Sequence, residues 1–355
     1  MPGLYQTTPT LFLTRSPVHL TQAEQDNLVK YVDGDSRGHV ESYFLKANDP
    51  TGPRAVWIKF TVFAPRGRPD QAAAEAWAIV FDGETKKHVA VKESHPAGTA
   101  DLGRDRVLFR VGRASFEHGR TSGTVEGDGH RVEWDLAFTT DAPPLHHFPA
   151  EWLYGSPLPA KVLTPHPDSS FDGHVAVDGR RLEVRAWPGM QGHNWGRRHS
   201  HRLAWGHCNA FIGASDTYFE GLSYQAKLGP VVSPYLTLLY LRHQGRAYDF
   251  TGVRHLYNPT AEVAFYRWSF TAEDAEVRLA GTLETTAEDM VGLYYRNPDG
   301  TLSHNLNSKI ARCRLELSRR QPSGAWQGFA ILESRDKAAL ELQVREPDHG
   351  VRMYV

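Results

Sequence analysis

A crowded group of histidines is the first feature of the sequence that could carry chemistry. Four of the eighteen histidines lie within fifteen residues, at His193, His199, His201 and His207. Such a group indicates a metal site, an acid–base centre or a polar seam in a pocket wall. On a strand, His199 and His201 would share one face, as metal ligands can. However, residues 191–211 contain no carboxylate and three arginines, so we expect no metal here.

Acid–base chemistry needs fewer partners than a metal site. One imidazole can transfer the proton, a neighbouring amide can orient the substrate, and a carboxylate can hold the imidazole in the required tautomer. His193 and Asn194 provide the first two groups, and we expect Glu220 to assist them. Glu117 and Asp135 are alternative carboxylate partners. A purely structural role also stays open, because "HNWG" suits a tight turn in which the histidine satisfies a buried carbonyl.

Aromatic residues near this segment predict the wall of a binding pocket. We expect substrate contacts from Trp195, Trp205, His207, Trp134 and Tyr240. The competing interpretation is that such aromatic residues fill the core. Glycine-rich stretches do not follow the pattern of a dinucleotide-binding or phosphate-binding loop, and no GxSxG elbow is present.

The elements that must position these residues are predominantly strands. Thirty-one glycines and twenty-two prolines separate many short runs of alternating apolar and polar residues, as in residues 55–65. Asp-Gly pairs at 82–83, 128–129 and 178–179 predict hairpin turns. Residues 22–32 predict one or two helical turns capped by Thr21. The fold class is therefore all-β with antiparallel strands.

The length of 355 residues favours two domains. The proline-rich residues 141–170 lack strand alternation, and proline cannot donate to a sheet ladder. We therefore expect an N-terminal domain over 1–160 and a C-terminal domain over 161–355 that carries the "HNWG" segment. Antiparallel barrels of about eight strands can enclose one small apolar ligand, which makes a barrel interior the expected site.

Charge and cysteine content bear on partners and location. Lysine and arginine number 40 against 41 acidic residues, which gives no field that would attract nucleic acid. Only Cys208 and Cys313 are present, which suits a reducing compartment, and we expect a cytoplasmic protein. No run approaches the roughly 20 apolar residues of a transmembrane helix, while transient contact with a membrane stays open.

Several motifs together resemble the carotenoid hydratase/AttH-like family, which includes fungal lipocalin-like Diels-Alderases and lipid-transfer relatives. The motifs are "GHNWG", a "WGH" about ten residues later, "GTVEGDGHRVEWDLAF" and "PLPAKVLTPHPDSSFDGHVAVDG". The resemblance implies two lipocalin-like β-barrel domains in tandem, a ligand pocket near their interface and no cofactor. Many members carry an acid just before the histidine, whereas this chain has Gly192.

The resemblance implies a function as well as a fold. The expected protein is a cofactor-independent hydratase, isomerase or cyclase that acts on a hydrophobic small molecule derived from an isoprenoid or a polyketide. Hydration through a carbocation needs a strong acid, and with Gly192 that donor must be His193 or an acid from elsewhere. The main alternative is a non-catalytic carrier of lipids or other hydrophobic ligands. A histidine-dependent metalloenzyme is the third.

Overall fold

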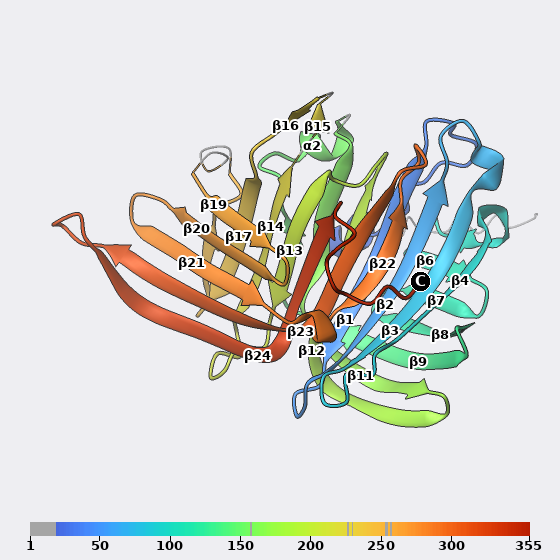
Figure 1. Cartoon of the computed structure of the whole chain (residues 1–355), viewed down its shortest axis with the longest axis horizontal. Helices are drawn as coiled ribbons and strands as arrows, with labels where there is room; N and C mark the ends of the chain where they lie inside the picture. The colour runs from blue at the N-terminus through green and yellow to red at the C-terminus, as the bar shows by residue number, and fades with distance from the viewer. Residues whose placement is uncertain (1–18, 157, 226, 229, 253–254, 256–257) are drawn as a thin grey trace, which may run out of the picture.

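The chain folds into two large antiparallel sheets, each curled into a half-barrel, which lie side by side (Figure 1). The computed structural model describes residues 19–156, 158–225, 227–228, 230–252, 255 and 258–355. The expected all-β fold of two antiparallel barrels in tandem is confirmed, with each barrel in the form of a half-barrel.

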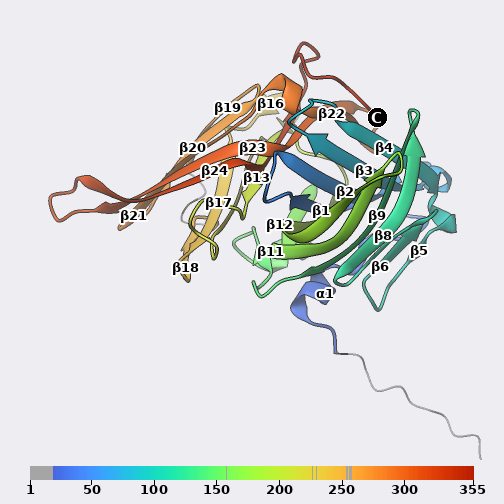
Figure 2. The ribbon, with the colours of Figure 1, turned by 90° about the horizontal axis from the view of Figure 1, so that it is seen from below.

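The first sheet has twelve strands in the order β4-β3-β2-β1-β12-β11-β9-β8-β7-β6-β5, and β10 pairs with β11. Its strands are β1 (His39–Asn48), β2 (Arg54–Ala64), β3 (Ala73–Asp82), β4 (Val89–Pro96), β5 (Asp101–Leu102), β6 (Leu108–Val111), β7 (Ala114–Glu117), β8 (Arg120–Gly127), β9 (His130–Thr139), β10 (Leu145–His146), β11 (Ala160–Val177) and β12 (Arg180–Gly196). The curvature of this sheet is clearest from below (Figure 2).

The second sheet has ten strands in the order β18-β17-β14-β13-β24-β23-β21-β20-β19, and β22 pairs with β23. Its strands are β13 (Arg202–Cys208), β14 (Tyr218–Gln225), β17 (Leu236–His243), β18 (Arg246–Asp249), β19 (Thr260–Ala264), β20 (Arg267–Glu273), β21 (Val277–Glu284), β22 (Val291–Arg296), β23 (Leu302–Arg320) and β24 (Trp326–Val344). A separate hairpin pairs β15 (Lys227–Leu228) with β16 (Val231–Val232).

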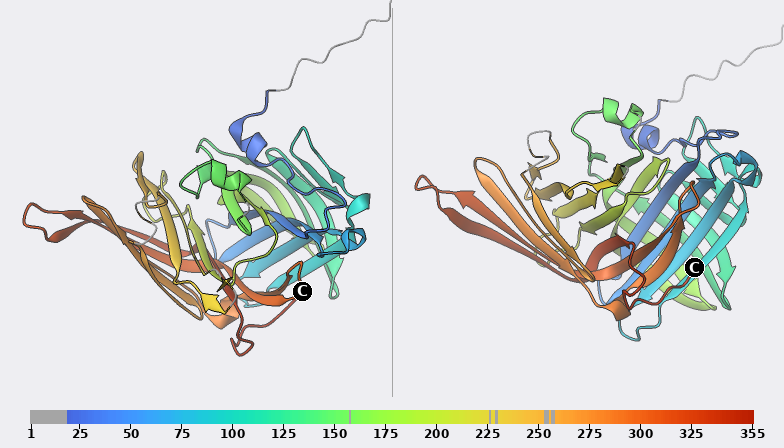
Figure 3. Two further views of the ribbon diagram at one scale, coloured as in Figure 1. Left: turned by 90° about the horizontal axis from the view of Figure 1, so that it is seen from above. Right: turned by 45° about the horizontal axis from the view of Figure 1, so that its top comes forward.

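Helical structure is short. The helices are α1 (Gln22–Asp26), α2 (Trp152–Gly155) and the 3-10 turns η1 (Pro69–Gln71), η2 (Ala97–Thr99) and η4 (Ala287–Asp289). The expected capping of α1 is confirmed, because the Thr21 side chain accepts from the Glu24 N–H and Glu24 in turn accepts from the Thr21 N–H. Both views of Figure 3 show α1 and α2 close together. None of the helices in the described ranges is long and apolar enough to cross a membrane.

The three Asp-Gly pairs lie at hairpin turns, as expected. Asp128-Gly129 joins β8 to β9 and Asp178-Gly179 joins β11 to β12, with both residues of each pair at positive φ. This conformation matches the right-handed twist of the flanking strands. Asp82-Gly83 begins the connection from β3 to β4.

The proline-rich stretch does not behave as expected. Its last residues form the start of β11, an 18-residue strand that pairs with β9 and β12 inside the first sheet. Register shifts occur between Leu163 and His166 and between His166 and Ser169, so Pro165 and Pro167 lie at irregularities where a ladder N–H is not needed. The "HNWG" segment is likewise part of β12, beside β1. We therefore propose a domain boundary after Gly196 instead of after residue 160.

Three clusters of buried apolar side chains hold the fold together. One fills the concave side of the first sheet, with Phe60, Phe109 and Phe116 in mutual contact. A second fills the second sheet around Trp268 and Phe270. The third lies between the sheets and joins residues such as Phe44, Trp57 and Met190 to Trp205, Leu222 and Tyr295. Apolar side chains thus fill both half-barrels and also pack between the sheets.

Candidate functional site

His193 belongs to a buried polar group on the concave side of the first sheet. We call this group the first-sheet cluster: Glu41, Tyr43, His39, His193 and Trp195. In the register of β1 and β12, Tyr43 is opposite His193 and Glu41 is opposite Trp195. The His193 ring stacks on Tyr43 with centroids 4.2 Å apart. Its Nδ1 is 2.7 Å from the Asp26 carbonyl oxygen, and its Nε2 is 2.9 Å from Glu41 Oε1. Both nitrogens of His193 therefore face acceptors.

Glu41 is fully buried and surrounded by hydrogen-bond donors. Its carboxylate accepts from the backbone N–H groups of Lys30 and Tyr31, at 2.8 and 2.7 Å, and from the Tyr43 hydroxyl at 2.8 Å. His39 and His193 each approach it to 2.9 Å. Burial alone would raise the pKa of Glu41, but the hydrogen bonds from His193 and His39 outweigh it and hold the pKa far below the usual carboxylate range. The cluster is thus a saturated, charged hydrogen-bond network.

The carboxylate partner of His193 is one that the sequence reasoning missed. Glu117 and Asp135 instead form ion pairs with Arg110 and Arg120, and Glu220 lies in a different cluster. One signal could have identified Glu41, because His39, Glu41 and Tyr43 occur at every second position of one strand and so share a face.

Asn194 does not share a site with His193. Adjacent residues of a strand point to opposite faces, so Asn194 of β12 lies on the side away from the first-sheet cluster, opposite Ser42 of β1. Trp195 does lie with His193, at a centroid distance of 4.9 Å, and the Lys30 ammonium is 5.5 Å from its ring.

The second buried polar group lies between the sheets, and we call it the inter-sheet cluster: Glu220, His207, Trp205, Thr164 and His147. Glu220 of β14 is directly opposite His207 of β13. Glu220 Oε1 accepts from Trp205 Nε1 at 2.9 Å and from the Thr164 hydroxyl of β11 at 2.8 Å. His147 Nε2, which follows β10, is 3.2 Å from the same oxygen. Glu220 therefore connects the second sheet to two segments of the first.

Several atoms of the inter-sheet cluster are buried and have no hydrogen-bond partner among the described residues. They are Glu220 Oε2, His207 Nδ1 and His147 Nδ1. His207 Nε2 is 2.7 Å from the Pro167 carbonyl oxygen, so this nitrogen carries the proton and donates. Burial, together with the nearby Lys46 ammonium, lowers the pKa of His207 to about 3, which leaves Nδ1 as a bare acceptor. Glu220 Oε2 and His207 Nδ1 are thus two unfilled acceptors on facing residues.

The charge state of Glu220 follows from its neighbours. Burial would raise its pKa, but His147 lowers it through both charge and hydrogen bonding, and His207 and Trp205 add to this effect. The net result is a pKa below the usual value, so the carboxylate form is present at neutral pH. An unpaired oxygen on a buried carboxylate is uncommon, because such atoms are normally satisfied by protein, water or ligand.

The irregular part of β11 brings the two sheets together here. Pro165 and Pro167 interrupt the pairing with β12, and polar groups at this irregular stretch contact β13 and β14. The Thr164 hydroxyl and the Pro167 carbonyl are the groups that contact the second sheet. The sequence feature that we expected to mark a linker is therefore what builds the cluster.

Aromatic side chains flank the inter-sheet cluster. The rings of Phe44 and Trp205 meet edge to face at 5.7 Å, and Tyr240 of β17 is opposite Glu220. Trp205, His207, Glu220 and Tyr240 were all expected at the site, and the structure brings them together. Trp134 lies elsewhere: it is 2% exposed in the core of the first sheet, with its Nε1 donating to the Thr121 hydroxyl at 2.9 Å. It is a core residue and does not line the space between the sheets.

Gly192 faces this same space. A Cβ atom at position 192 would lie 2.4 Å from Phe44 Cζ, so the Phe44 ring fills the volume that an acid at this position would need. We expect Gly192→Ala to lower the free energy of unfolding by about 1–3 kcal/mol through overpacking. Chemical denaturation of Gly192→Ala, Phe44→Leu and the double variant measures the coupling. An additive double variant would contradict the contact.

Three buried lysines add positive charge between the sheets. Lys46 and Lys309 are each 1% exposed, and Lys59 is 5% exposed. The Lys46 and Lys309 ammonium groups donate to Asn48 and Asn307, at 2.8 and 2.9 Å. Burial lowers the pKa of Lys46 to about 8 and that of Lys309 to about 7. The ammonium form of Lys46 acts on both Glu220 and His207, so the inter-sheet cluster lies in a positive environment.

The four crowded histidines do not converge. His193 lies in the first-sheet cluster, His207 lies in the inter-sheet cluster, and His199 faces Asn297 with its Nδ1 3.1 Å from Oδ1. Within the described ranges, no group of three or more histidine, cysteine, aspartate and glutamate side chains is arranged to hold a metal ion.

Comparison with known sequences gives one match. Residues 161–342 match the profile of a family described as tocopherol cyclase-like. These residues include β11 and β12 of the first sheet and most of the second sheet, and they contain Thr164, His207 and Glu220. No curated protein sequence matches the chain.

Solved structures match over most of the chain at low sequence identity. A putative AttH from Nitrosomonas europaea has a TM-score of 0.52 and 12% identity over 92% of this chain and 98% of its own. Kievitone hydratase from Nectria haematococca has a TM-score of 0.54 and 9% sequence identity, and the match covers 90% of this chain and 94% of the hydratase. CghA with Sch210972 has a TM-score of 0.51 and 11% sequence identity, and the match covers 87% of this chain and 88% of CghA. These likenesses confirm the fold as two tandem lipocalin-like half-barrels.

Proposed function

The chain belongs to the tocopherol cyclase-like family, and from this premise we propose that it is an enzyme that closes a ring in a hydrophobic small molecule by acid–base catalysis between its two sheets. The fold neighbours support an activity of this general type, since one is a hydratase and another was solved with the small molecule Sch210972. A carrier with the same fold would have no need of a charged, incompletely bonded group at the binding surface.

The observation that carries the proposal is the pair of unfilled acceptors, Glu220 Oε2 and His207 Nδ1. Leaving a buried polar atom unpaired costs about 1–3 kcal/mol, so a fold that keeps two of them on facing residues gains if a ligand fills them. Two adjacent acceptors fit a hydroxyl or another proton donor of the substrate. Trp205 and Phe44 offer apolar faces for the rest of the molecule.

In the proposed reaction, the Glu220 carboxylate takes the proton from a substrate hydroxyl. The resulting oxyanion attacks the far carbon of a double bond conjugated to a carbonyl, and the new C–O bond closes the ring. The displaced π electrons move onto the carbonyl oxygen as an enolate. The proton then returns from the Glu220–His147 pair to the enolate carbon, so the product is an isomer of the substrate.

The buried lysines favour this anionic route over a carbocation. Lys46 and Lys309 lie close enough to His207 to lower its pKa, and both carry positive charge when protonated. Positive charge in a buried, low-dielectric region stabilises a developing oxyanion and destabilises a carbocation. Protonation of an isolated double bond, as in the hydration expected from the resemblance, is therefore the less favoured chemistry here.

The first-sheet cluster has a supporting role in this proposal. Both ring nitrogens of His193 are engaged, so it has no free position for a substrate. We propose that His193 and Trp195 hold β12 and α1 in place, and that Asn194, on the opposite face, is the member of the "HNWG" motif nearest the space between the sheets. The function proposed for Glu220 needs no proton transfer by His193.

The test uses two matched substrates, an ortho-hydroxyaryl enone and an ortho-prenylated phenol, with the purified protein in D₂O. We expect the enone to give a cyclic isomer with one deuterium at the carbon next to the carbonyl, and the phenol to remain unchanged. Cyclisation or hydration of the prenylated phenol would overturn the anionic route. Binding of both compounds without conversion of either would overturn the enzyme and favour the carrier.

A further inference from the structure

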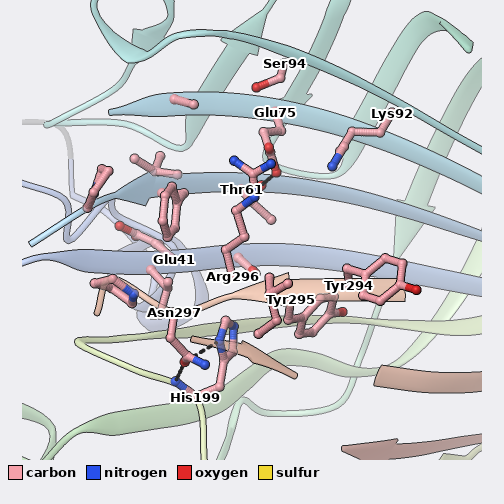
Figure 4. A pocket seen from close by; sticks show the side chains of 18 of the residues that line it. Glu41, Thr61, Glu75, Lys92, Ser94, His199, Tyr294, Tyr295, Arg296 and Asn297 are labelled. Carbon is pink, nitrogen blue, oxygen red and sulfur yellow. Dashed lines mark hydrogen bonds between the residues drawn. The ribbon is translucent and has the colours of Figure 1, made fainter. Parts of the chain in front are cut away.

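A pocket of about 560 Å³ opens between the sheets at a place distinct from the inter-sheet cluster. Its walls come from β1 to β4 of the first sheet and from β22 and the residues that follow it in the second (Figure 4). In the strand order, β1 to β4 lie on one side of β12, whereas the inter-sheet cluster uses β11 on the other side. The proposed reaction makes no use of this pocket.

Lys59 is a buried cation in the wall of this pocket. Its ammonium group is 3.9 Å from the ring centroid of Tyr295, and 5.4 and 5.8 Å from those of Trp77 and Trp57. No hydrogen bond or ion pair joins this ammonium to another described residue, although the side chain is only 5% exposed. Burial lowers the pKa of Lys59 to about 8. A buried ammonium that faces a pocket without an acceptor is costly unless a ligand supplies one.

The other charges of the pocket favour a negative ligand. Arg68, Lys92 and Arg296 also line it, and none of them forms an ion pair with a described carboxylate. Figure 4 shows Arg296 extending from β22 toward Thr61 and Glu75. The pocket thus presents four cations.

The negative groups of the lining have donors of their own. Glu75 accepts from the Thr61 hydroxyl at 2.8 Å and from Trp77 Nε1 at 3.1 Å. Glu41 is saturated by the first-sheet cluster. The cations therefore remain available to a ligand.

We propose that this pocket binds an apolar organic anion, with its carboxylate on the Lys59 ammonium and its apolar body against Trp77 and Tyr295. The Lys59 ammonium supplies the charge, and the aromatic rings around it exclude water. A charge-assisted hydrogen bond is stronger in such a buried place than at the surface. Binding of an anion in this pocket is independent of the reaction proposed above.

The test measures direct binding by calorimetry with three probes of equal chain length: dodecanoate, dodecanol and dodecyl phosphate. We expect dodecanoate to bind at one site per chain and dodecanol to bind about 10- to 100-fold more weakly, as the loss of one charge-assisted hydrogen bond implies. Equal affinity for dodecanoate and dodecanol would overturn the proposal. If dodecyl phosphate binds more tightly than dodecanoate, the proposed carboxylate head group is wrong and the pocket prefers a phosphate.

Substitutions of single lysines test whether dodecanoate binds at Lys59. Lys59→Met keeps the length and apolar character of the side chain, and we expect it to weaken dodecanoate by the same factor while leaving dodecanol unchanged. Lys86→Met, at an exposed lysine paired with Asp289, is the control that should bind normally. If Lys59→Met does not fold, acetylation of the wild-type lysines read by mass spectrometry replaces it. Dodecanoate should then protect Lys59 and not Lys86, and equal labelling with and without dodecanoate would overturn the proposal.

Discussion

Glu220→Gln is expected to reduce turnover of the ortho-hydroxyaryl enone by about 10²- to 10⁴-fold, which is the usual contribution of a general base. Glutamine has nearly the same shape as glutamate and can still accept the hydrogen bonds that Trp205 and Thr164 donate to Oε1. Its amide would occupy the position of Oε2, where it cannot take a proton. The measurement is the initial rate at saturating substrate, with the affinity for substrate determined separately.

The matched control for this prediction is Glu117→Gln. Glu117 lies on the first sheet, where it pairs with Arg110 at 3.7 Å and its side chain is 52% exposed. The same chemical change there should leave both the rate and the affinity unaltered. Full activity in Glu220→Gln would contradict the role of Glu220, and an equal loss in both variants would point to a general effect of the lost charge.

Glu41→Gln is expected to lower the free energy of unfolding by about 1–3 kcal/mol, the typical cost of leaving a buried hydrogen-bonding group without its partner. All five neighbours of the Glu41 carboxylate donate hydrogen bonds, so an amide NH₂ in its place would face donors and leave some of them without an acceptor. Chemical denaturation at neutral pH measures the loss. An effect as small as that of the exposed control Glu133→Gln would contradict the saturated network.

The acidity of Glu41 gives this prediction a second measurement. Because the pKa of Glu41 is lower in the folded protein than in the unfolded chain, its stabilisation is complete above the unfolded value of about 4.3 and is lost as the pH falls below it. Stability of the wild type should therefore decline more steeply with acid than stability of Glu41→Gln. Parallel acid profiles would show that Glu41 is not held ionised by its neighbours.

Turns and helix ends could be predicted from the sequence where neighbouring residues alone determine the backbone conformation. Asp128-Gly129 and Asp178-Gly179 adopt the positive φ values that a two-residue hairpin needs, and few other pairs do so at low cost. Thr21 with Glu24 likewise specifies the start of α1. These signals depend only on neighbouring residues, so no knowledge of tertiary structure was required.

Residues that depend on strand pairing could not be assigned in the same way. Pro165 and Pro167 indicated a linker, but bulges in β11 accommodate them within a central strand of the first sheet. His193 and Glu220 were grouped because acid–base chemistry needs an imidazole and a nearby carboxylate. Only the register shows that His193 faces Glu41 within the first sheet while Glu220 faces the space between the sheets.

The role of His147 could not be predicted from the sequence either. It lies in "PLHHFP", a segment without periodicity, and nothing near it in sequence marks it as a partner of Glu220. Glu220, His207, Trp205 and Tyr240 could be found because each is a polar or aromatic residue at alternating strand positions in the second sheet. Their first-sheet partners, Thr164 and His147, come from irregular segments that only the packing of the two sheets brings into contact.

The most direct measurement of the central claim is a crystal structure of Glu220→Gln with the ortho-hydroxyaryl enone bound. We predict that the ligand lies between β11 and β14, with its hydroxyl within hydrogen-bond distance of His207 Nδ1 and of the side chain at position 220. A ligand found instead on the concave side of the first sheet, against His193, would contradict the account.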